Sequence, residues 1–310
     1  MKNILINTTL SEKALEMLET SSHKIYNQNV VGQDCLTFIE ANSIDTLITR
    51  SDLLTDDILS DETLKTVGLT DDSSLLKQNT NVKVITSSNA GDRSVAEMVF
   101  GHILSTSRYL YDSNRLMPLE GDLNFESLHQ TYALGNEIKG KTLGVIGVNA
   151  ISKEVIKIAI AFGMNITVAD VNVGETLSVE LEFIGKKHLT FDFEIQSFEQ
   201  VCLKSDIISY HTENISEFRM DKEVFGLLKM GASVINTSYP GIIDEVALME
   251  AIDEGIVKHA ALDCFENQPK PDMRILMNPS ISLSPNIASL TKESQNRRGE
   301  SIVSTLLNPS

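Results

Sequence analysis

Short apolar runs alternate with helical patterns along almost the whole of the 310-residue chain. In the first third, three of these runs predict β-strands: NILIN (3–7), DTLIT (45–49) and VKVIT (82–86). After the first run, Ser11 is placed to cap a helix whose apolar face carries Ala14 and Leu18. Strands that are separated by helices are typical of α/β folds with a parallel sheet.

The same alternation continues through the rest of the chain. Residues 94–115 carry apolar side chains at helical spacing and predict one long helix. Later runs predict five strands: LTFDF (189–193), DIISY (206–210), ASVINTS (232–238), KHAALDC (258–264) and ISLSP (281–285). A last helix, starting at Thr291, is expected to return to the first domain.

Residues 141–170 are the most informative segment, because they predict a strand, a turn, a helix and a second strand that ends in Asp170. The run TLGVIG is continuously apolar, as a parallel strand covered on both faces must be. The helix, 153–162, places Val155 and Ala159 on one apolar stripe. Asp170 follows the turn at about the 20-residue offset at which an acid contacts ribose hydroxyls. This pattern predicts a dinucleotide-binding βαβ unit.

The glycine loop of this unit departs from the usual G-x-G-x-x-G fingerprint. Gly147 is retained, but Asn149 and Ser152 stand where the second and third glycines are expected. The second glycine normally lets the backbone approach the pyrophosphate. Asparagine tolerates a left-handed backbone better than most residues, yet its side chain would occupy space that the phosphate needs. The loop therefore predicts weakened nucleotide binding.

Composition and charge narrow the class of protein. A content of 42% hydrophobic and 22% charged residues is that of a soluble globular protein. The net charge of −17 argues against nucleic acid or an anionic membrane as a partner, because both select basic surfaces. No apolar run approaches the roughly 20 residues of a transmembrane helix. The three cysteines lack metal-ligand spacing, so we expect no metal site and a cytoplasmic protein with reduced, buried thiols.

Nine segments, taken in order, resemble the D-isomer-specific 2-hydroxyacid dehydrogenases, and within that family the D-3-phosphoglycerate dehydrogenases. The segments are ITRSDLLTDDIL, RSVAEMVFGHIL, EIKGKTLGVIG, IAFGMNITVAD, SDIISYHT, LLKMGASVINTS, GIIDEVALMEAI, AALDCFENQP and LSPNIASLTKESQ. The resemblance implies a doubly wound Rossmann nucleotide-binding domain at 94–287, inserted into a smaller flavodoxin-like α/β substrate domain made of 1–93 and 288–310. It also implies a dimer built around the helix after Ser94, in a short form without an appended regulatory domain.

The chemistry implied by the resemblance is hydride transfer between NAD and the carbon that bears the substrate hydroxyl. An arginine holds the substrate carboxylate, a histidine takes the hydroxyl proton, and a carboxylate orients that histidine. These positions fall on Tyr239 in NTSYPG, Asn286 in SPNIA and Gln268 in FENQP. Tyrosine has no positive charge, asparagine does not titrate, and glutamine carries no charge to stabilise an imidazolium. We therefore expect the usual hydride transfer to be lost.

The resemblance also assigns cofactor-binding positions. These are Gly147, Asn149, Ile151, Asp170, His211, Thr237, Ser238 and Asp263. At His211-Thr-Glu213 the family has His-x-Pro, so a carboxylate is added near the expected cofactor. NAD is the expected cofactor, with weakened or absent binding.

On the substrate side, Arg50 and Ser51 match an Arg-Ser pair of the family and are expected to contact an anionic group. An ordinary ion-paired surface arginine is the alternative interpretation of Arg50. Where the family has a glycine-rich loop, GLTDDSS adds Asp71 and Asp72. These acids would repel a phosphate-bearing substrate.

Three functions stay open. The favoured one is a divergent family member without the usual activity, acting as a binding or regulatory subunit in a homodimer or in a heterodimer with a relative. The alternative is an active NAD-dependent oxidoreductase on a small 2-hydroxy or 2-keto acid such as 3-phosphoglycerate, with His211 or a water as proton acceptor. The third is a co-repressor-like protein that uses the fold to bind peptides.

Overall fold

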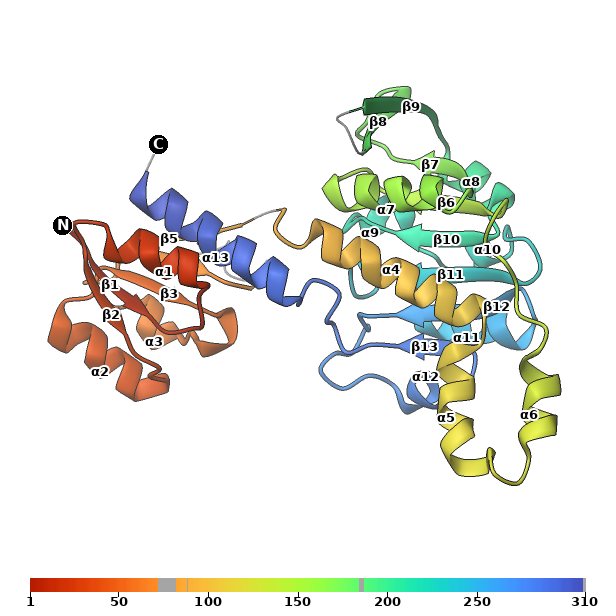
Figure 1. Ribbon diagram of the computed structural model, residues 1–310, viewed down its shortest axis with the longest axis horizontal. Helices are drawn as coiled ribbons and strands as arrows, with labels where there is room; N and C mark the ends of the chain where they lie inside the picture. Colours follow the sequence, from red (N-terminus) through yellow and green to blue (C-terminus); the bar gives the residue numbers. More distant parts are fainter. Residues whose placement is uncertain (72–81, 88, 184–186, 309–310) are drawn as a thin grey trace. The chain divides into compact units, whose positions relative to one another are not determined.

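The computed structural model describes residues 1–71, 82–87, 89–183 and 187–308, so Asp72 lies outside the described residues. The chain divides into two compact units (Figure 1). The first joins Met1–Gly91 to Leu290–Ser310, and the second is Asp92–Ser289. These divisions lie within a few residues of the boundaries that the sequence predicts.

The first unit alternates strands with helices. Its elements are β1 Asn3–Ile6, α1 Glu12–Glu19, β2 Lys24–Asn27, α2 Gly32–Asn42, β3 Thr46–Thr49, the short 3-10 helix η1 Ser51–Leu53, α3 Asp56–Leu59, β4 Thr66–Leu69, β5 Lys83–Thr86 and α13 Lys292–Leu307. Among the described residues, five parallel strands pair in the order β2-β1-β3-β4-β5, which is the flavodoxin-like order. Helices α1 and α13 cover one face of this sheet, and α2 and α3 cover the other.

The first unit confirms the predicted start and return of the chain. Ser11 accepts the backbone N–H of Ala14 at 3.2 Å and caps α1, whose Ala14 and Leu18 are buried. Thr291 caps α13 in the same way, by accepting the N–H of Ser294 at 3.1 Å. Each cap satisfies a backbone donor that the first turn of a helix leaves unpaired. Ile302, Val303 and Leu306 of α13 share a core with β1 and α1, so the last helix returns to the first unit as predicted.

The second unit is larger and is wound on both faces of its sheet. Its elements are α4 Asp92–Ser107, α5 Leu110–Glu120, α6 Phe125–Tyr132, β6 Thr142–Ile146, α7 Ala150–Ala161, β7 Asn165–Ala169, β8 Thr176–Phe183, β9 Lys187–Gln196, α8 Phe198–Lys204, β10 Ile207–Tyr210, α9 Ile215–Phe218, α10 Lys222–Phe225, β11 Ala232–Asn236, α11 Glu245–Asp253, β12 Val257–Leu262, α12 Met273–Met277 and β13 Ile281–Leu283. In the part of the chain that is described, eight strands pair in the order β13-β12-β11-β10-β6-β7-β9-β8. Helices α4 and α7 pack on one face, and α8, α10 and α11 pack on the other. This is the expected doubly wound arrangement.

The predicted long helix at 94–115 is wrong in one respect, because it is broken. Helix α4 ends at Ser107 and α5 begins at Leu110, with Tyr109 between them in the left-handed conformation (φ 55°). Thr106 contributes to this end, since its hydroxyl donates to the carbonyl oxygens of His102 and Ile103 instead of to solvent. Apolar spacing continues across the break, which is why the pattern alone predicts a single helix.

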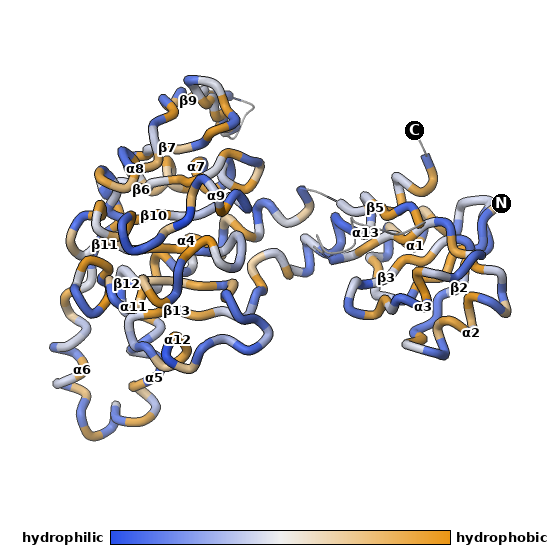
Figure 2. Tube along the Cα trace, turned by 180° about the vertical axis from the view of Figure 1, so that it is seen from behind, coloured by the Kyte–Doolittle hydropathy of each residue, from blue (hydrophilic) through white to orange (hydrophobic). Residues whose placement is uncertain are grey.

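Helices α5 and α6 form an arm, residues 110–134, that extends away from the sheet of the second unit (Figure 1). Apolar and polar positions are mixed along it (Figure 2). Leu128 is buried, but the apolar residues most exposed in this arm reach 74% for Leu119, 84% for Leu123 and 77% for Leu134. Helices of this length are only marginally stable in water by themselves. Large exposed apolar patches are typical of surfaces that contact a partner.

Strands β8 and β9 form an antiparallel hairpin, of which the sequence predicts only residues 189–193. Leu177 and Val179 alternate with polar residues and pack into the core beneath α7. The alternation in TLSVELEF is a strand signal that was available in the sequence.

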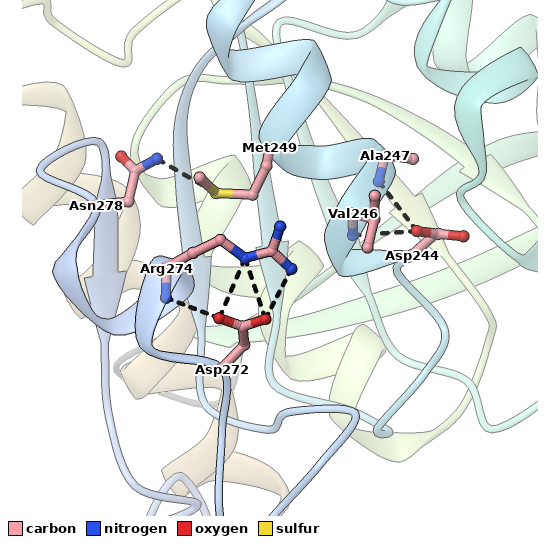
Figure 3. Close-up of polar contacts among 7 residues, drawn as sticks. All are labelled: Asp244, Val246, Ala247, Met249, Asp272, Arg274 and Asn278. Atoms are coloured by element: carbon pink, nitrogen blue, oxygen red, sulfur yellow. Dashed lines mark hydrogen bonds and ion pairs between the residues drawn. The ribbon is translucent and has the colours of Figure 1, made fainter.

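Two aspartates fix the helix starts that follow the predicted catalytic segments (Figure 3). Asp244 accepts the N–H groups of Val246 and Ala247 at the start of α11. Asp272 accepts the N–H of Arg274 at 2.8 Å, and also binds its guanidinium, at the start of α12. These caps set the ends of the segments that carry Tyr239 and Gln268, because both residues lie just before the capped helices.

Gly144, in the middle of β6, provides a test of how tightly α8 packs on the sheet. A Cβ atom on Gly144 would lie 2.2 Å from the Ser205 hydroxyl and 2.8 Å from a Val201 methyl group. We expect Gly144→Ala to lower the free energy of unfolding by about 1–3 kcal/mol through overpacking, measured by urea denaturation. Gly174→Ala is the control, since no atom lies within 4 Å of its added Cβ. Equal midpoints for the two variants would contradict this packing.

Candidate functional site

The predicted cofactor positions gather at the carboxyl edge of the larger sheet. Strand β6 pairs with β7 on one side and with β10 on the other, so the direction of winding reverses between β6 and β10. Ligands of open α/β sheets bind outside the carboxyl ends of the strands at such a reversal. Strands β6, β7, β10, β11 and β12 are followed directly by Gly147, Asp170, His211, Thr237 and Asp263, in that order.

Gly147 allows the loop after β6 to pass close to the end of β10. Its φ of 90° lies in the region that favours glycine. An added Cβ would lie 2.6 Å from the Cβ of Thr212 and 2.9 Å from the carbonyl oxygen of His211. This first glycine of the loop is therefore required by packing, whatever the loop binds.

Asn149 closes the start of α7. Its backbone is extended (φ −150°, ψ −170°), so it does not use the left-handed conformation that the sequence allows. Its Oδ1 accepts the N–H of Ser152 at 2.9 Å, while its own N–H donates to the Ser152 hydroxyl at 2.8 Å. Its Nδ2 donates to the carbonyl oxygen of His211 at 2.6 Å. The side chain thus spans from α7 to the end of β10, beside the helix start that binds pyrophosphate in dinucleotide sites.

Asp170, at the end of β7, is partly buried and supports the same loop. One carboxylate oxygen accepts the N–H of Val148 at 2.6 Å and the other accepts that of Asn172 at 2.6 Å. Each oxygen keeps a further lone pair, so the carboxylate can still accept ribose hydroxyls. Ile151, in the first turn of α7, is half-buried and packs against the core.

His211 is 2% exposed at the end of β10, and its burial lowers its pKa to about 3. Its Nε2 has no hydrogen-bond partner among the described residues. At neutral pH the ring is therefore uncharged and a weak proton acceptor. The hypothesis that His211 replaces the catalytic base finds no support in this environment.

Thr237 and Ser238 follow β11. The Ser238 hydroxyl donates to the carbonyl oxygen of Thr212 at 2.7 Å, which joins the ends of β11 and β10. The Thr237 hydroxyl is buried and has no partner in the part of the chain that the structure describes. A buried hydroxyl without a partner is the kind of group that a ligand satisfies. Asp170 and Thr237 thus offer NAD a carboxylate with free lone pairs and a buried hydroxyl without a partner, while the Asn149 side chain occupies the N–H of Ser152 at the helix start.

The three substituted catalytic positions lie on loops at this edge. Tyr239 is partly buried, and its carbonyl oxygen accepts the Asn236 side-chain amide at 3.0 Å. Gln268 is exposed, and its Oε1 receives the N–H of Phe265 at a long 3.4 Å. Asn286 is exposed and left-handed, with φ 55°.

Two buried carboxylates hold the loops of Gln268 and Asn286. Glu245 accepts the N–H of Glu266 at 2.9 Å, and its burial raises its pKa. Asp263 accepts the N–H of Ile287 at 3.0 Å through one oxygen and that of Ala288 at 2.9 Å through the other.

The sequence missed both of these contacts. Glu245 follows a helix cap and has the position of a first-turn acid, and the resemblance assigns Asp263 to the cofactor rather than to the loop of Asn286. No local sequence signal connects either carboxylate with its loop, because each contact joins separate segments.

The predicted substrate residues lie in the first unit and are already bonded. The guanidinium of Arg50 donates to both carboxylate oxygens of Asp52, at 2.9 and 2.8 Å, and both side chains are more than half exposed. Ser51 donates its N–H to Asp71 at 2.9 Å and its hydroxyl to the other oxygen of Asp71. Arg50 is therefore an ion-paired surface residue in this structure, and its contact with a substrate stays a prediction.

The described residues contain no group of three or more His, Cys, Asp or Glu side chains that could hold a metal ion. Cys35, Cys202 and Cys264 are unpaired and buried, and burial raises the pKa of each thiol. Among the helices of the described ranges, none combines the length and the apolar character that crossing a bilayer requires.

Comparison with known proteins agrees with the resemblance. Residues 100–288 match the family model of the D-isomer specific 2-hydroxyacid dehydrogenase NAD binding domain. D-3-phosphoglycerate dehydrogenase of Bacillus subtilis is 32% identical over 305 residues, which cover 95% of this chain and 54% of that protein. Hydroxypyruvate reductase of Thermotoga maritima is 28% identical, with 96% of this chain and 95% of that protein covered. The chain spans about half the length of the phosphoglycerate dehydrogenases of B. subtilis and Methanocaldococcus jannaschii.

Solved structures show the same fold. The holo form of D-mandelate dehydrogenase from Rhodotorula graminis superimposes with a TM-score of 0.79 at 18% identity, covering 99% of this chain and 94% of that one. NAD-dependent formate dehydrogenase from Staphylococcus aureus, in complex with NAD, gives a TM-score of 0.70 at 20% identity, covering 99% and 94%. By its matched domain and its similarity along the chain, this protein belongs to the D-isomer specific 2-hydroxyacid dehydrogenase family.

Proposed function

We propose that this chain is a divergent member of the family that keeps the nucleotide-binding scaffold without the usual hydride transfer, and that it acts as a binding or regulatory subunit. One observation carries the proposal. The loops at the carboxyl edge are held in place by Glu245 and Asp263, but the catalytic positions on these loops and after β11 carry Gln268, Asn286 and Tyr239. The contacts that hold these loops are present, but the arginine, carboxylate and histidine that the reaction uses are absent from them.

The consequences for catalysis follow from the side chains. NAD, when bound, supplies the hydride acceptor or donor. Tyr239 cannot form the bidentate contact that an arginine makes with a substrate carboxylate. Asn286 can hydrogen-bond a hydroxyl but cannot remove its proton, and loss of a general base lowers a rate by roughly 10²–10⁴. The burial of His211 and its lowered pKa argue against it as a substitute for that base.

The first unit supports the same view. An anionic substrate at Arg50 or Ser51 would have to displace the carboxylates of Asp52 and Asp71 from the donors that they occupy. The Arg50–Asp52 pair is exposed, and exposed ion pairs contribute roughly 0–1 kcal/mol, so its competition lowers affinity without forbidding binding. Because this pair is weak, the alternative stays open, which is an active NAD-dependent oxidoreductase on a small 2-hydroxy or 2-keto acid such as 3-phosphoglycerate. The names of the relatives from B. subtilis and T. maritima favour that alternative.

The arm formed by α5 and α6 is the proposed partner surface. Most of the apolar side chains of α4 are buried within the second unit, whereas Leu119, Leu123 and Phe125 of the arm are exposed. Exposed apolar patches of this kind mark association surfaces. The proposed occupant is a second copy of this chain, and an active relative is the other candidate.

Restoring the charged groups tests the loss of activity. The triple variant Tyr239→Arg, Gln268→Glu, Asn286→His is expected to oxidise a D-2-hydroxy acid at least about 10²-fold faster than the original chain, because the loops remain held. Turnover is followed by NADH absorbance with 3-phosphoglycerate and a panel of D-2-hydroxy acids. Asn286→His alone is the control and should gain far less, since the three groups act as a unit. An ordinary rate from the original chain would refute the proposal.

Asn149 should weaken NADH binding. We expect Asn149→Gly to lower the dissociation constant of NADH about tenfold, because the N–H of Ser152 is then free to donate to the pyrophosphate and the side chain no longer occupies space beside it. Asn149→Asp is the matched control. It keeps the helix cap but adds a negative charge, so it should bind NADH more weakly than the original chain. Calorimetric titration measures both, and equal affinities for the glycine variant and the original chain would count against the idea.

The arm should control association. We expect the chain to be a dimer by light scattering, and the double variant Leu119→Glu, Leu123→Glu to be a monomer, because charges would face an apolar interface. Leu203→Glu is the control, since Leu203 is also an exposed helical leucine (54%) but lies on α8. A monomeric original chain at micromolar concentration would exclude the homodimer.

A further inference from the structure

His102 of α4 is a buried histidine placed between two serines of another segment. Its side chain is nearly inaccessible, with 4% of its surface exposed. Its Nδ1 lies 3.0 Å from the hydroxyl of Ser282, in β13, and its Nε2 lies 3.0 Å from the hydroxyl of Ser284, just after β13. Both serines are themselves buried. A buried polar group of this kind must have its donors and acceptors matched.

The positions of the protons in this cluster can be deduced. The Ser284 hydroxyl donates to a carboxylate oxygen of Asp263, which has no proton to give back. A hydroxyl has one proton, so toward His102 Ser284 can only accept. The proton of the imidazole is therefore on Nε2. A neutral imidazole carries one N–H, so Nδ1 must accept from the hydroxyl of Ser282.

The environment favours this neutral form. Burial lowers the pKa of His102, while the charge of Asp263 acts in the opposite direction. The pKa stays below its ordinary value, so the ring is neutral at neutral pH. The cluster is then a series of hydrogen bonds that all donate in one direction, from the Ser282 hydroxyl through His102 and the Ser284 hydroxyl to Asp263.

This series of hydrogen bonds ends at Asp263, which holds the loop that carries Asn286. Besides Ser284, Asp263 accepts the N–H groups of Ile287 and Ala288, which directly follow Asn286. The left-handed backbone of Asn286 is unusual for a residue other than glycine and has to be held by its neighbours. We propose that His102, as its Nε2–H tautomer, is a positioning residue that holds the loop 284–288 by fixing the orientation of Ser284 toward Asp263. The inference rests on the proposed function only in taking Asn286 as part of the site.

The tautomer can be observed directly in the full chain by NMR with ¹⁵N-labelled histidine. Loss of one signal in His102→Gln identifies its ring among the six histidines. We expect one neutral ring with its proton on Nε2 at pH 7. Ser282→Ala should leave the proton on Nε2, whereas Ser284→Ala should give a mixture of tautomers, because the acceptor is gone. A proton on Nδ1, or on both nitrogens, in the original chain would overturn the proposal.

Amide hydrogen exchange tests the positioning role. We expect His102→Leu to speed exchange at Ile287 and Ala288 about fivefold, the factor that corresponds to the loss of one hydrogen bond. His102→Gln should restore slow exchange, because its amide can donate to Ser284. Amides of β11 serve as the reference for global stability and should not change. Unchanged exchange in the loop, or equal acceleration in β11, would refute the role. Neither experiment uses a cofactor or substrate, so its result does not depend on whether hydride transfer is lost.

Discussion

The parallel pairing of β6 with β10 is the constraint on which the second unit depends. The winding of the chain reverses between these strands, so the loops that follow them must pass each other at one edge of the sheet. Gly147 makes this possible, because its missing side chain leaves space for the backbone of His211 and for Thr212. The contacts of Asn149 with His211 and of Ser238 with Thr212 then join three strand ends into one surface. The candidate residues Gly147, Asn149, His211 and Ser238 are positioned by these contacts.

The residues that hold the loops of the candidate site differ from the residues at its catalytic positions. Glu245 and Asp263 are buried carboxylates whose work is to accept backbone N–H groups from loops. Removing Asp263 would leave the buried N–H of Ala288 unpaired, which destabilises a protein by about 1–3 kcal/mol. The positions of Tyr239 and Asn286 are constrained differently, because the left-handed backbone of Asn286 favours asparagine over most residues but does not require a charged side chain. Folding therefore depends on the two carboxylates, whereas an arginine at position 239 or a histidine at position 286 would serve only the reaction.

The fold could be predicted from the sequence because it depends on local patterns. The structure confirms the β6–α7–β7 segment, which apolar runs predict, the cap at Ser11, which its residue type predicts, and the helix that follows Thr291. The break at Tyr109 could not be predicted, since its side chain fits the helical pattern and only its backbone departs from it.

The candidate site was less predictable, because its contacts join distant segments. The resemblance singles out Asp263, but no pattern in the sequence connects it through Ser284 to His102, which lies in a separate segment. Likewise the carboxylates at Arg50 and Ser51 come from Asp52 and Asp71, and only the structure pairs them.

The β8–β9 hairpin has a consequence for how the molecule behaves in a crowded solution. It ends the larger sheet with an antiparallel strand whose outer backbone groups have no neighbouring strand among the described residues. Such an edge invites strand addition by another chain, which is a route to aggregation. Here the edge strand alternates its apolar residues with Glu180 and Glu182, and the opposite edge, β13, has only three residues. The acidic side chains of β8 and the short length of β13 both disfavour the addition of a strand from another molecule.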